Sequence, residues 1–433
     1  MSVFWNLLKT NRNYRYTWMG QVVSEVGDHF NTIAVFSLAL NMTGSGLAVS
    51  GVMLARAVPA ILAAPVAGIC LDNTDRKRVM IASDMVRFLV AVAFVFTVEH
   101  IRAPWILYVL SALLMFASPF FTSGRISILP KVASPEELHT ANSLTQTTNW
   151  MALTVGTALG GITVSKLGYE WAFVFNAVSF LFSAWCISRL KSKDGHFRAV
   201  KTATGPRVVR PWHDYVSGLR YMKASPLILG IGLIHVGWAT GGGAAQILFT
   251  LFGETVFHRG PAGIGIIWSF AGVGLLIGGV IGHRIGRLAS FNGYKRTIAI
   301  CYAIHGLAYV IFSQAPEFWQ ALVFITISRA GVAVSSVMNF SQLLRHVADE
   351  YRGRVFSTIE SMQWSTMMLS MMAAGIASQS YSPRTIGAVA GILSSTTAIF
   401  WTWAHLTGRL PEPKVIVPEV VEPEVALHGE GDA

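Results

Sequence analysis

Charged residues and cysteines are scarce in this chain of 433 residues. Only 13% of the residues are Asp, Glu, Lys or Arg, whereas a soluble domain carries roughly a quarter. Hydrophobic residues make up 53%, and the mean hydropathy is +0.51. Apolar stretches of about twenty residues, long enough to cross a bilayer, recur along the chain. The composition therefore excludes a soluble, disordered or collagen-like chain and predicts a multi-pass membrane protein.

Several motifs that mark other classes of protein are also missing. Cys70, Cys186 and Cys301 are far apart and lie in or beside apolar stretches, so we expect neither a disulfide nor a zinc site. The sequence has no phosphate-binding loop, no His-Glu-x-x-His motif and no Gly-x-Ser-x-Gly motif. We therefore expect no enzymatic activity, no cofactor, no metal and no binding of nucleic acid.

Hydropathy predicts an all-α fold with twelve transmembrane helices, found with a window of about nineteen residues. The expected spans are 15–41, 47–71, 79–98, 104–124, 142–165, 170–189, 226–252, 262–286, 295–313, 316–341, 354–380 and 384–406. A longer connection separates the sixth span from the seventh. We therefore predict one six-helix bundle at 1–190 and a second at 225–408. A cytoplasmic linker at 191–224 joins them, and a tail follows at 409–433. The tail is acidic and proline-broken, so we expect it to be disordered.

The two halves of the sequence resemble each other. Gly161 corresponds to Gly375 and Trp150 to Trp364, an offset of 214 residues in both pairs. A duplicated six-helix unit predicts two pseudo-symmetric bundles around a central site, which is the architecture of alternating access. Chance alignment of glycine-rich helices is the alternative.

The basic residues predict the orientation in the membrane. Of the 33 Lys and Arg residues, 26 fall on one side of the predicted spans and 4 on the other. Because positive loops stay in the cytoplasm, we expect both termini to be cytoplasmic and the protein to lie in the plasma (inner) membrane. The remaining three, Arg56, Arg87 and Arg329, fall inside predicted spans.

The most specific motif lies between the second and third predicted helices. It reads Gly68-Ile-Cys-Leu-Asp72-Asn-Thr-Asp75-Arg76-Lys77-Arg78, a glycine and an aspartate followed by a basic cluster. Further short motifs lie elsewhere in the chain. They are Asn11 to Arg15, Leu54 to Pro59, Asp84 with Arg87, Arg125, Leu129-Pro130, Glu136 to Leu138, Ala141 to Leu144 and Arg352-Gly353-Arg354-Val355-Phe356.

Together these segments resemble the major facilitator superfamily, and within it the drug and siderophore exporters that include enterobactin-exporter-like and macrolide-efflux-like proteins. The resemblance implies the major facilitator fold and a cytoplasmic gate. In that gate Asp72 latches the second helix against the eleventh, near Gly353, in the outward-facing state. Gly68, Arg76, Lys77, Arg78 and Arg354 complete the predicted gate. Asn73 and Asp75 depart from the family pattern and weaken its charges; a loop that is basic only because it is cytoplasmic is the alternative.

The first predicted helix carries a polar stripe. Its members recur at helical spacing on one face: Gln21, Ser24, Glu25, Asp28, Asn31 and Thr32. A carboxylate in a bilayer is unfavourable by a few kcal/mol unless it faces water or a partner, so the stripe must face the protein interior. Arg56 is placed to pair with Asp28 or Glu25, and Asp84 with Arg87. The stripe is either a proton-coupling or cation-substrate site, with the deeper Asp28 favoured, or an ion pair that only orients helices.

Further polar and aromatic residues predict the lining of a cavity. They are Gln146 and Asn149 in the fifth helix, Trp238 in the seventh, and Glu360, Gln363 and Trp364 in the eleventh. Such a mixture suits an amphipathic organic substrate, although ordinary packing between helices explains each residue taken singly.

We therefore expect a secondary active transporter that exports a small amphipathic molecule by proton antiport and works as a monomer in the bilayer. The direction and the substrate class follow from the resemblance. An importer of a small metabolite, a non-transporting receptor or scaffold, and a membrane enzyme are the alternatives.

Overall fold

The computed structural model describes residues 2–100, 103–192, 196–198 and 211–413. These residues form an all-α fold of fourteen α-helices and one π-helix, η1. Their bounds are α1 Ser2–Thr10, α2 Arg12–Thr43, α3 Gly46–Asn73, α4 Arg76–His100, α5 Pro104–Val132, α6 Pro135–Leu167, α7 Tyr169–Ser188, α8 Pro211–Ala224, α9 Pro226–Leu251, η1 Phe252–Val256, α10 Gly260–Leu288, α11 Phe291–Gln314, α12 Phe318–His346, α13 Asp349–Ala377 and α14 Pro383–Leu406.

The predicted spans coincide with α2 to α7 and α9 to α14. Within the described ranges, nine of these helices are long and apolar enough to cross a membrane, so the chain is a multi-pass membrane protein. The other three, α2, α6 and α13, fall short because polar residues interrupt them. Membrane crossing by all twelve therefore stays a prediction.

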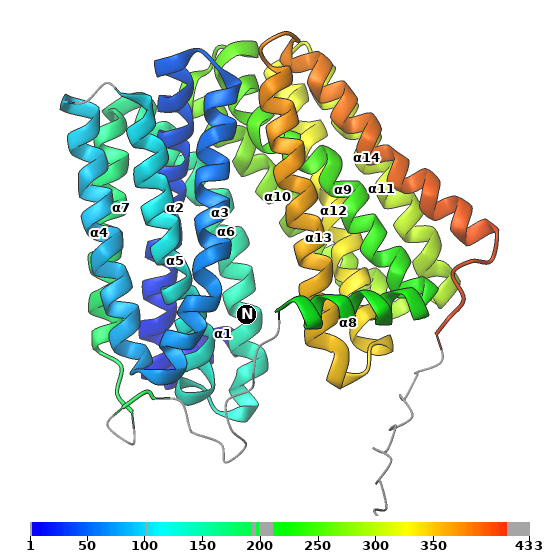
Figure 1. Ribbon diagram of the computed structural model, residues 1–433, viewed down its shortest axis with the longest axis horizontal. Coiled ribbons are helices and arrows are strands. Elements are labelled where there is room, and N and C mark those ends of the chain that lie inside the picture. The colour runs from blue at the N-terminus through cyan, green and yellow to red at the C-terminus, as the bar shows by residue number, and fades with distance from the viewer. Residues whose placement is uncertain (1, 101–102, 193–195, 199–210, 414–433) are drawn as a thin grey trace, which may run out of the picture.

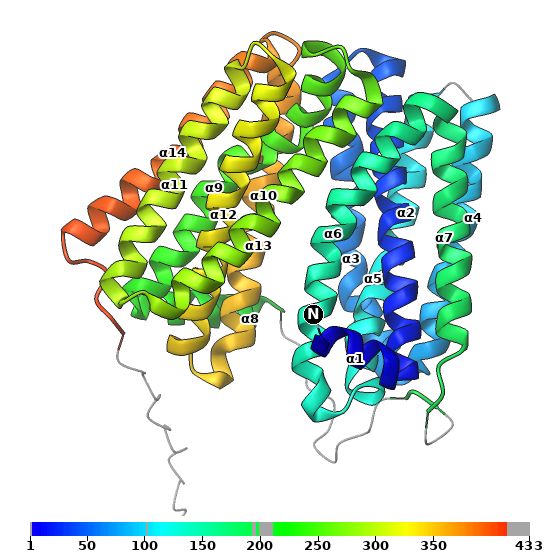
Figure 2. The same ribbon diagram turned by 180° about the vertical axis from the view of Figure 1, so that it is seen from behind.

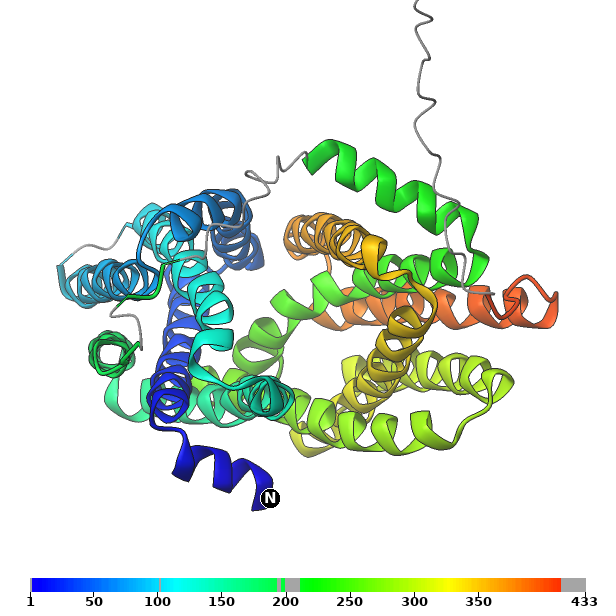
Figure 3. The same ribbon diagram turned by 90° about the horizontal axis from the view of Figure 1, so that it is seen from below.

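The helices form two groups that lean apart at one end (Figures 1 and 2). Helices α1 to α7 lie on one side, with α2 packed on α6 and α7 and α3 on α5. Helices α8 to α14 lie on the other, with α10 packed on α12 and α11 on α14. Seen from below, α1 and α8 lie at the same end of the molecule, on opposite edges (Figure 3). We call this end the α8 end.

The predicted linker contains a helix that hydropathy did not indicate. Helix α8 lies across the end of its group (Figure 1), where Arg354 Nε donates to Asp214 Oδ1 at 3.1 Å. Gly218 packs closely on Thr358 of α13. Helix α8 has fourteen residues and is too short to span a bilayer. A search for membrane spans by hydropathy therefore does not find it. The rest of the linker, 193–195 and 199–210, and the tail from 414 onward lie outside the described residues.

The two groups touch at the end opposite α8. Among the described residues, three hydrogen bonds join them: Ser37 Oγ to Glu254 Oε1 at 2.5 Å, Ser50 Oγ to the Met371 carbonyl at 3.0 Å, and the Ala262 N–H to Ser165 Oγ at 3.0 Å. Helices α6 and α10 approach so closely there that a Cβ on Gly265 would overlap the carbonyl oxygen of Thr157. At the α8 end, a Cβ on Gly68 or Gly353 would meet nothing within 4 Å. The molecule is therefore open toward the α8 end.

We predict that Gly265→Ala shifts the conformation toward closure of the α8 end, because the added methyl group separates α6 from α10 at the far end. Spin labels at Asn73→Cys and Glu350→Cys, exposed positions at the same helix ends, should report a shorter distance in a background without the native cysteines. Gly286→Ala is the control, since its Cβ would meet only Met338, at 3.7 Å. Identical distance distributions for both substitutions would contradict the prediction.

Candidate functional site

The polar stripe of α2 faces the interior of its helix group. Gln21 and Ser24 are 2% exposed, and Asn31 is fully buried. Three arginines approach the stripe, each from a different helix: Arg56 from α3, Arg87 from α4 and Arg125 from α5. The stripe is therefore a point where four helices meet through charged and amide groups.

Glu25 is held by the most partners. Arg125 Nη1 lies 2.9 Å from Glu25 Oε1, and Gln21 Nε2 donates to the same oxygen at 3.0 Å. With its nitrogen turned toward the carboxylate, the Asn149 amide donates to Glu25 at 2.8 Å, and Gln146 lies beside it. The structure thus brings the predicted residues of the fifth span, on α6, onto the stripe.

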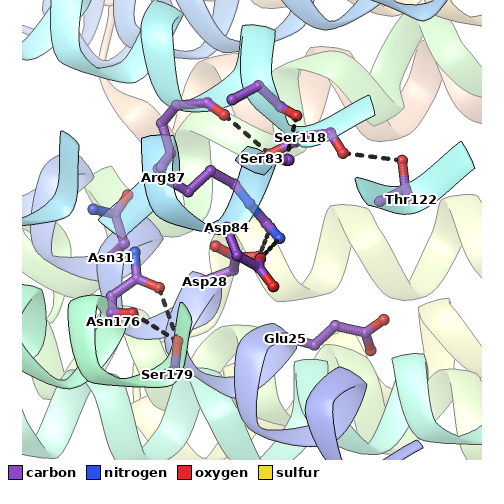
Figure 4. Close-up of polar contacts among 12 residues, drawn as sticks. Glu25, Asp28, Asn31, Ser83, Asp84, Arg87, Ser118, Thr122, Asn176 and Ser179 are labelled. Atoms are coloured by element: carbon purple, nitrogen blue, oxygen red, sulfur yellow. Dashed lines mark hydrogen bonds and ion pairs between the residues drawn. The ribbon is translucent and has the colours of Figure 1, made fainter. Parts of the chain in front are cut away.

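Asp28 and Asp84 share one arginine (Figure 4). Arg87 Nη2 bonds Asp84 Oδ1, and its Nη1 lies 3.9 Å from Asp28 Oδ2. The guanidinium lies between the rings of Phe121 and Phe180, 4.6 and 4.4 Å from their centres. The side chains of Asp84 and Arg87 are 0% and 2% exposed, whereas that of Asp28 is 28% exposed. Asp28 is therefore the more exposed of the two acids.

The proposed ion pair between Arg56 and Asp28 or Glu25 does not form. Arg56 donates instead to Asn31 Oδ1 at 3.2 Å and to Thr32 Oγ1 at 3.0 Å. The physical reason is that Arg87 and Arg125 occupy the two carboxylates.

Arg125 is the site residue that sequence reasoning missed. We expected the fourth span to end at 124, which left Arg125 in a loop. Helix α5 instead continues to Val132, so Arg125 lies inside it and reaches Glu25. The signal was present, because Ile126, Ile128 and Leu129 continue the apolar pattern beyond it.

Cavities lie between the two helix groups. One of about 320 Å³ is lined by Thr32, Arg56, Trp268 and Trp364 among others. A second, of about 510 Å³, lies between α3 and α13 and is lined by Glu360 and again by Trp364. Trp238 lines a third, of about 290 Å³. Of the residues predicted to line a cavity, Gln146, Asn149 and Gln363 border none of the three.

The predicted gate residues do not meet across the two groups in this conformation. Asp72 is 74% exposed and lies 4.0 Å from Arg76 of its own group. Arg76 also donates to the Ser127 carbonyl at 2.7 Å, and Lys77 Nζ to the Ser188 and Leu190 carbonyls at 2.7 and 2.9 Å. Arg78 is exposed, and Arg354 pairs with Asp214 of α8. The basic residues at positions 76 and 77 thus brace α4 against α5 and α7.

Asp75 has a role that the motif did not indicate. Its Oδ1 accepts the Arg78 N–H at 3.2 Å, which caps α4, and its Oδ2 accepts the Phe197 N–H at 2.9 Å, which fastens the start of the linker. Burial alone would raise the pKa of Asp75, but these backbone donors hold that pKa below its ordinary value. The contact is therefore present above the ordinary aspartate pKa of about 4 and is lost as the pH falls through the lowered value.

We predict that Asp75→Ala frees this part of the linker at neutral pH, because both backbone donors lose their acceptor. Trypsin should then cleave after Arg198 faster than in the wild type. Asp72→Ala is the matched control, since Asp72 is exposed and faces only Arg76. Equal cleavage rates for the two variants would refute the role given to Asp75.

We also predict that Arg87→Leu strongly destabilises the protein, because it leaves Asp28 and Asp84 without their shared partner. Removing one member of a buried ion pair lowers the free energy of unfolding by about 3–5 kcal/mol. Thermal unfolding of the purified protein in detergent measures the effect. Arg78→Leu, an exposed position on the same helix, should change it little, and a similar loss in both variants would contradict the prediction.

Apolar helices, ion pairs in the interior and cavities between two helix groups are typical of a membrane transporter. Residues 17–292 match the family model described as Major Facilitator Superfamily, so the chain belongs to this superfamily. The resemblance drawn from the motifs is confirmed for the superfamily, and several similar proteins are named as exporters, in agreement with the expected branch.

Similar proteins agree with this class. BacE of Bacillus subtilis (strain 168), named as a bacilysin exporter, is 23% identical over 349 residues, 81% of this chain and 84% of BacE. Macrolide efflux protein A of Streptococcus pyogenes is 22% identical over 365 residues, 83% and 87% of the two chains. The crystal structure of a bacterial homologue of the iron transporter ferroportin, in the inward-facing state, has a TM-score of 0.69 at 17% identity, over 90% and 98% of the chains. These relatives are transporters and not enzymes.

Proposed function

We propose that this protein is a secondary active transporter that exports a small amphipathic molecule in exchange for protons, by alternating access. The exporters among its relatives support the direction of transport. The observation that carries the proton coupling is the position of Asp28, a partly exposed acid that shares Arg87 with a fully buried one.

The topology that this function requires is twelve spans in two pseudo-symmetric six-helix bundles, 1–190 and 225–408. The sequence offset of 214 residues between Gly161 and Gly375 supports this arrangement. The α8 end is cytoplasmic in this proposal, because the basic loops gather there. The conformation described above is then inward-facing, and both termini lie in the cytoplasm at the inner membrane.

Asp28 is the proton carrier in this proposal, and Glu25 is structural. Glu25 accepts hydrogen bonds from an arginine and from two amides, so its negative charge is already balanced by donors. Asp28 forms one long ion pair among the described residues, with Arg87 at 3.9 Å, and Arg56 acts on it from a greater distance. Its Oδ1 has no hydrogen-bond partner in the same part of the chain. Protonation of Asp28 removes its attraction to Arg87, which then binds Asp84 alone. The contact between α2 and α4 weakens, and the balance between the inward and outward states changes.

The gate follows from the same cycle. When the α8 end closes, the ends of α3 and α13 approach, and exposed Asp72 reaches the first turn of α13 near Gly353. The N–H groups of a helix N-terminus attract a carboxylate, which gives the outward-facing state a latch. The second half has no equivalent acid in Gly282-His-Arg-Ile-Gly-Arg287, so the latch is one-sided.

Everted membrane vesicles test the coupling. We predict that an amphipathic compound accepted by the wild type dissipates an imposed inside-acid gradient, followed with a pH-sensitive dye. Asp28→Asn should abolish this proton movement while folded protein remains in the membrane. Glu412→Gln is the control, because its side chain is exposed and lies outside the proposed site and gate. Normal gradient-dependent transport by Asp28→Asn would make Asp28 a structural residue.

A further inference from the structure

The third cavity, of about 290 Å³, contains a charge that the proposed mechanism does not use. It lies where α6 meets α9, α10 and α12, and its lining includes Trp150, Trp238, Gln246, Trp268 and Arg329. Arg329 belongs to α12 and is 7% exposed. Gly274 of α10 leaves room for it, since a Cβ on that glycine would lie 2.9 Å from Arg329 Cβ. The side chain is thus built into the wall of the cavity.

Arg329 lacks a counterion in the part of the chain that the structure describes. Among the described residues, no carboxylate lies within 4.0 Å of its guanidinium and no hydrogen bond reaches it. The guanidinium lies 5.3 Å from the centre of the Phe249 ring, and its polar neighbours Tyr309 and His305 are not acids. Arg87 and Arg125 have carboxylates, and Arg56 has two side-chain acceptors and interacts with Asp28. A guanidinium keeps its charge in proteins, and a buried charge is unfavourable without a partner.

The rest of the lining is rich in donors and poor in acceptors. None of the described residues that line this cavity is acidic. Trp238 and Trp268 both line it, and the indole N–H of each is buried without a hydrogen-bond partner among the described residues. Buried donors of this kind are rare in proteins. A ligand with several acceptor oxygens would complement both the charge and the donors.

The neighbouring cavity supplies an apolar surface. It shares Leu153, Gln246 and Trp268 with the cavity of Arg329, so the two adjoin. Its remaining walls include Phe36, Met53 and Met371. Methionine and aromatic side chains adapt to flat organic groups. Glu360 borders only the more distant cavity between α3 and α13, so it does not neutralise Arg329.

We propose that Arg329 binds an anionic group, such as a carboxylate, sulfonate or phosphate, of an amphipathic organic substrate whose apolar part occupies the adjoining cavity. This inference rests on the proposed transport function and names its substrate class. It makes the preferred cargo an organic anion and not a cationic drug.

A matched pair of fluorescent probes tests the charge preference. Anilinonaphthalene sulfonate is an amphipathic anion, and N-phenylnaphthylamine has the same aromatic skeleton without the sulfonate. Energy transfer from tryptophan measures the binding of each probe to the purified full-length protein in a neutral detergent. We predict that Arg329→Gln weakens binding of the anion about tenfold or more, as expected for loss of a buried charge-assisted contact. Binding of the neutral probe should stay within about twofold of the wild type.

Two further variants complete the design. Arg329→Lys should retain part of the affinity for the anion, because it keeps the charge and loses the planar fork. Arg345→Gln removes an exposed charge from the same helix and should leave both probes unaffected. Equal losses for the two probes in Arg329→Gln, or an unchanged affinity for the anion, would overturn the proposal.

Competition identifies the source of the anion. Millimolar chloride or inorganic phosphate that displaces the sulfonate probe would assign the site to an inorganic ion and overturn the proposal. Displacement by phosphatidylglycerol, but not by phosphatidylcholine, would assign it to a lipid headgroup and overturn it as well. Displacement by neither supports an organic anion. These binding measurements are made at equilibrium without a proton gradient. Their outcome therefore does not depend on whether Asp28 carries the proton.

Discussion

The interior of a membrane protein tolerates a charge only where an opposite charge or a water-filled cavity meets it, and this constraint arranges the first helix group. Three acids, Glu25, Asp28 and Asp84, lie on α2 and α4, and arginines of α4 and α5 bind them. The pair of Glu25 with Arg125 joins α2 to α5, and the pair of Asp28 with Arg87 joins α2 to α4, so these ion pairs fix which helices surround α2. Asp84 holds Arg87 from the same helix, α4. The apolar packing outside them serves mainly to place these helices in lipid.

The same network contains one weak point. Arg87 is held by two aromatic rings and by Asp84, so it is fixed in position. Asp28 is bound more loosely, at 3.9 Å, and its side chain is 28% exposed. Because Arg87 cannot readily move, protonation of Asp28 changes the contact between α2 and α4 and not the position of Arg87. The second group has no comparable acid in its interior among the described residues, and Arg329 there is left for a ligand in our proposal.

Much of the fold could be predicted from the sequence, because long apolar stretches in lipid form helices almost obligatorily. Each expected span lies on a helix, and the polar stripe of α2 faces inward as its spacing indicated. The pairing of charges could not be predicted, since it depends on lateral neighbours. Arg56 was matched to Asp28 because α2 and α3 are adjacent in sequence, whereas Arg125, from a more distant helix, reaches Glu25. Helix α8 could not be predicted from hydropathy because it is short and polar.

The central claim is that Asp28 is the acid that exchanges a proton while its neighbours stay paired. Infrared difference spectroscopy of the purified protein, recorded as the pH is lowered, tests it most directly. The account predicts a carboxylic acid C=O band that grows on acidification in the wild type and is missing from Asp28→Asn. It also predicts that this band persists in Glu412→Gln, which removes an exposed acid. A spectrum of Asp28→Asn identical to that of the wild type would contradict the claim.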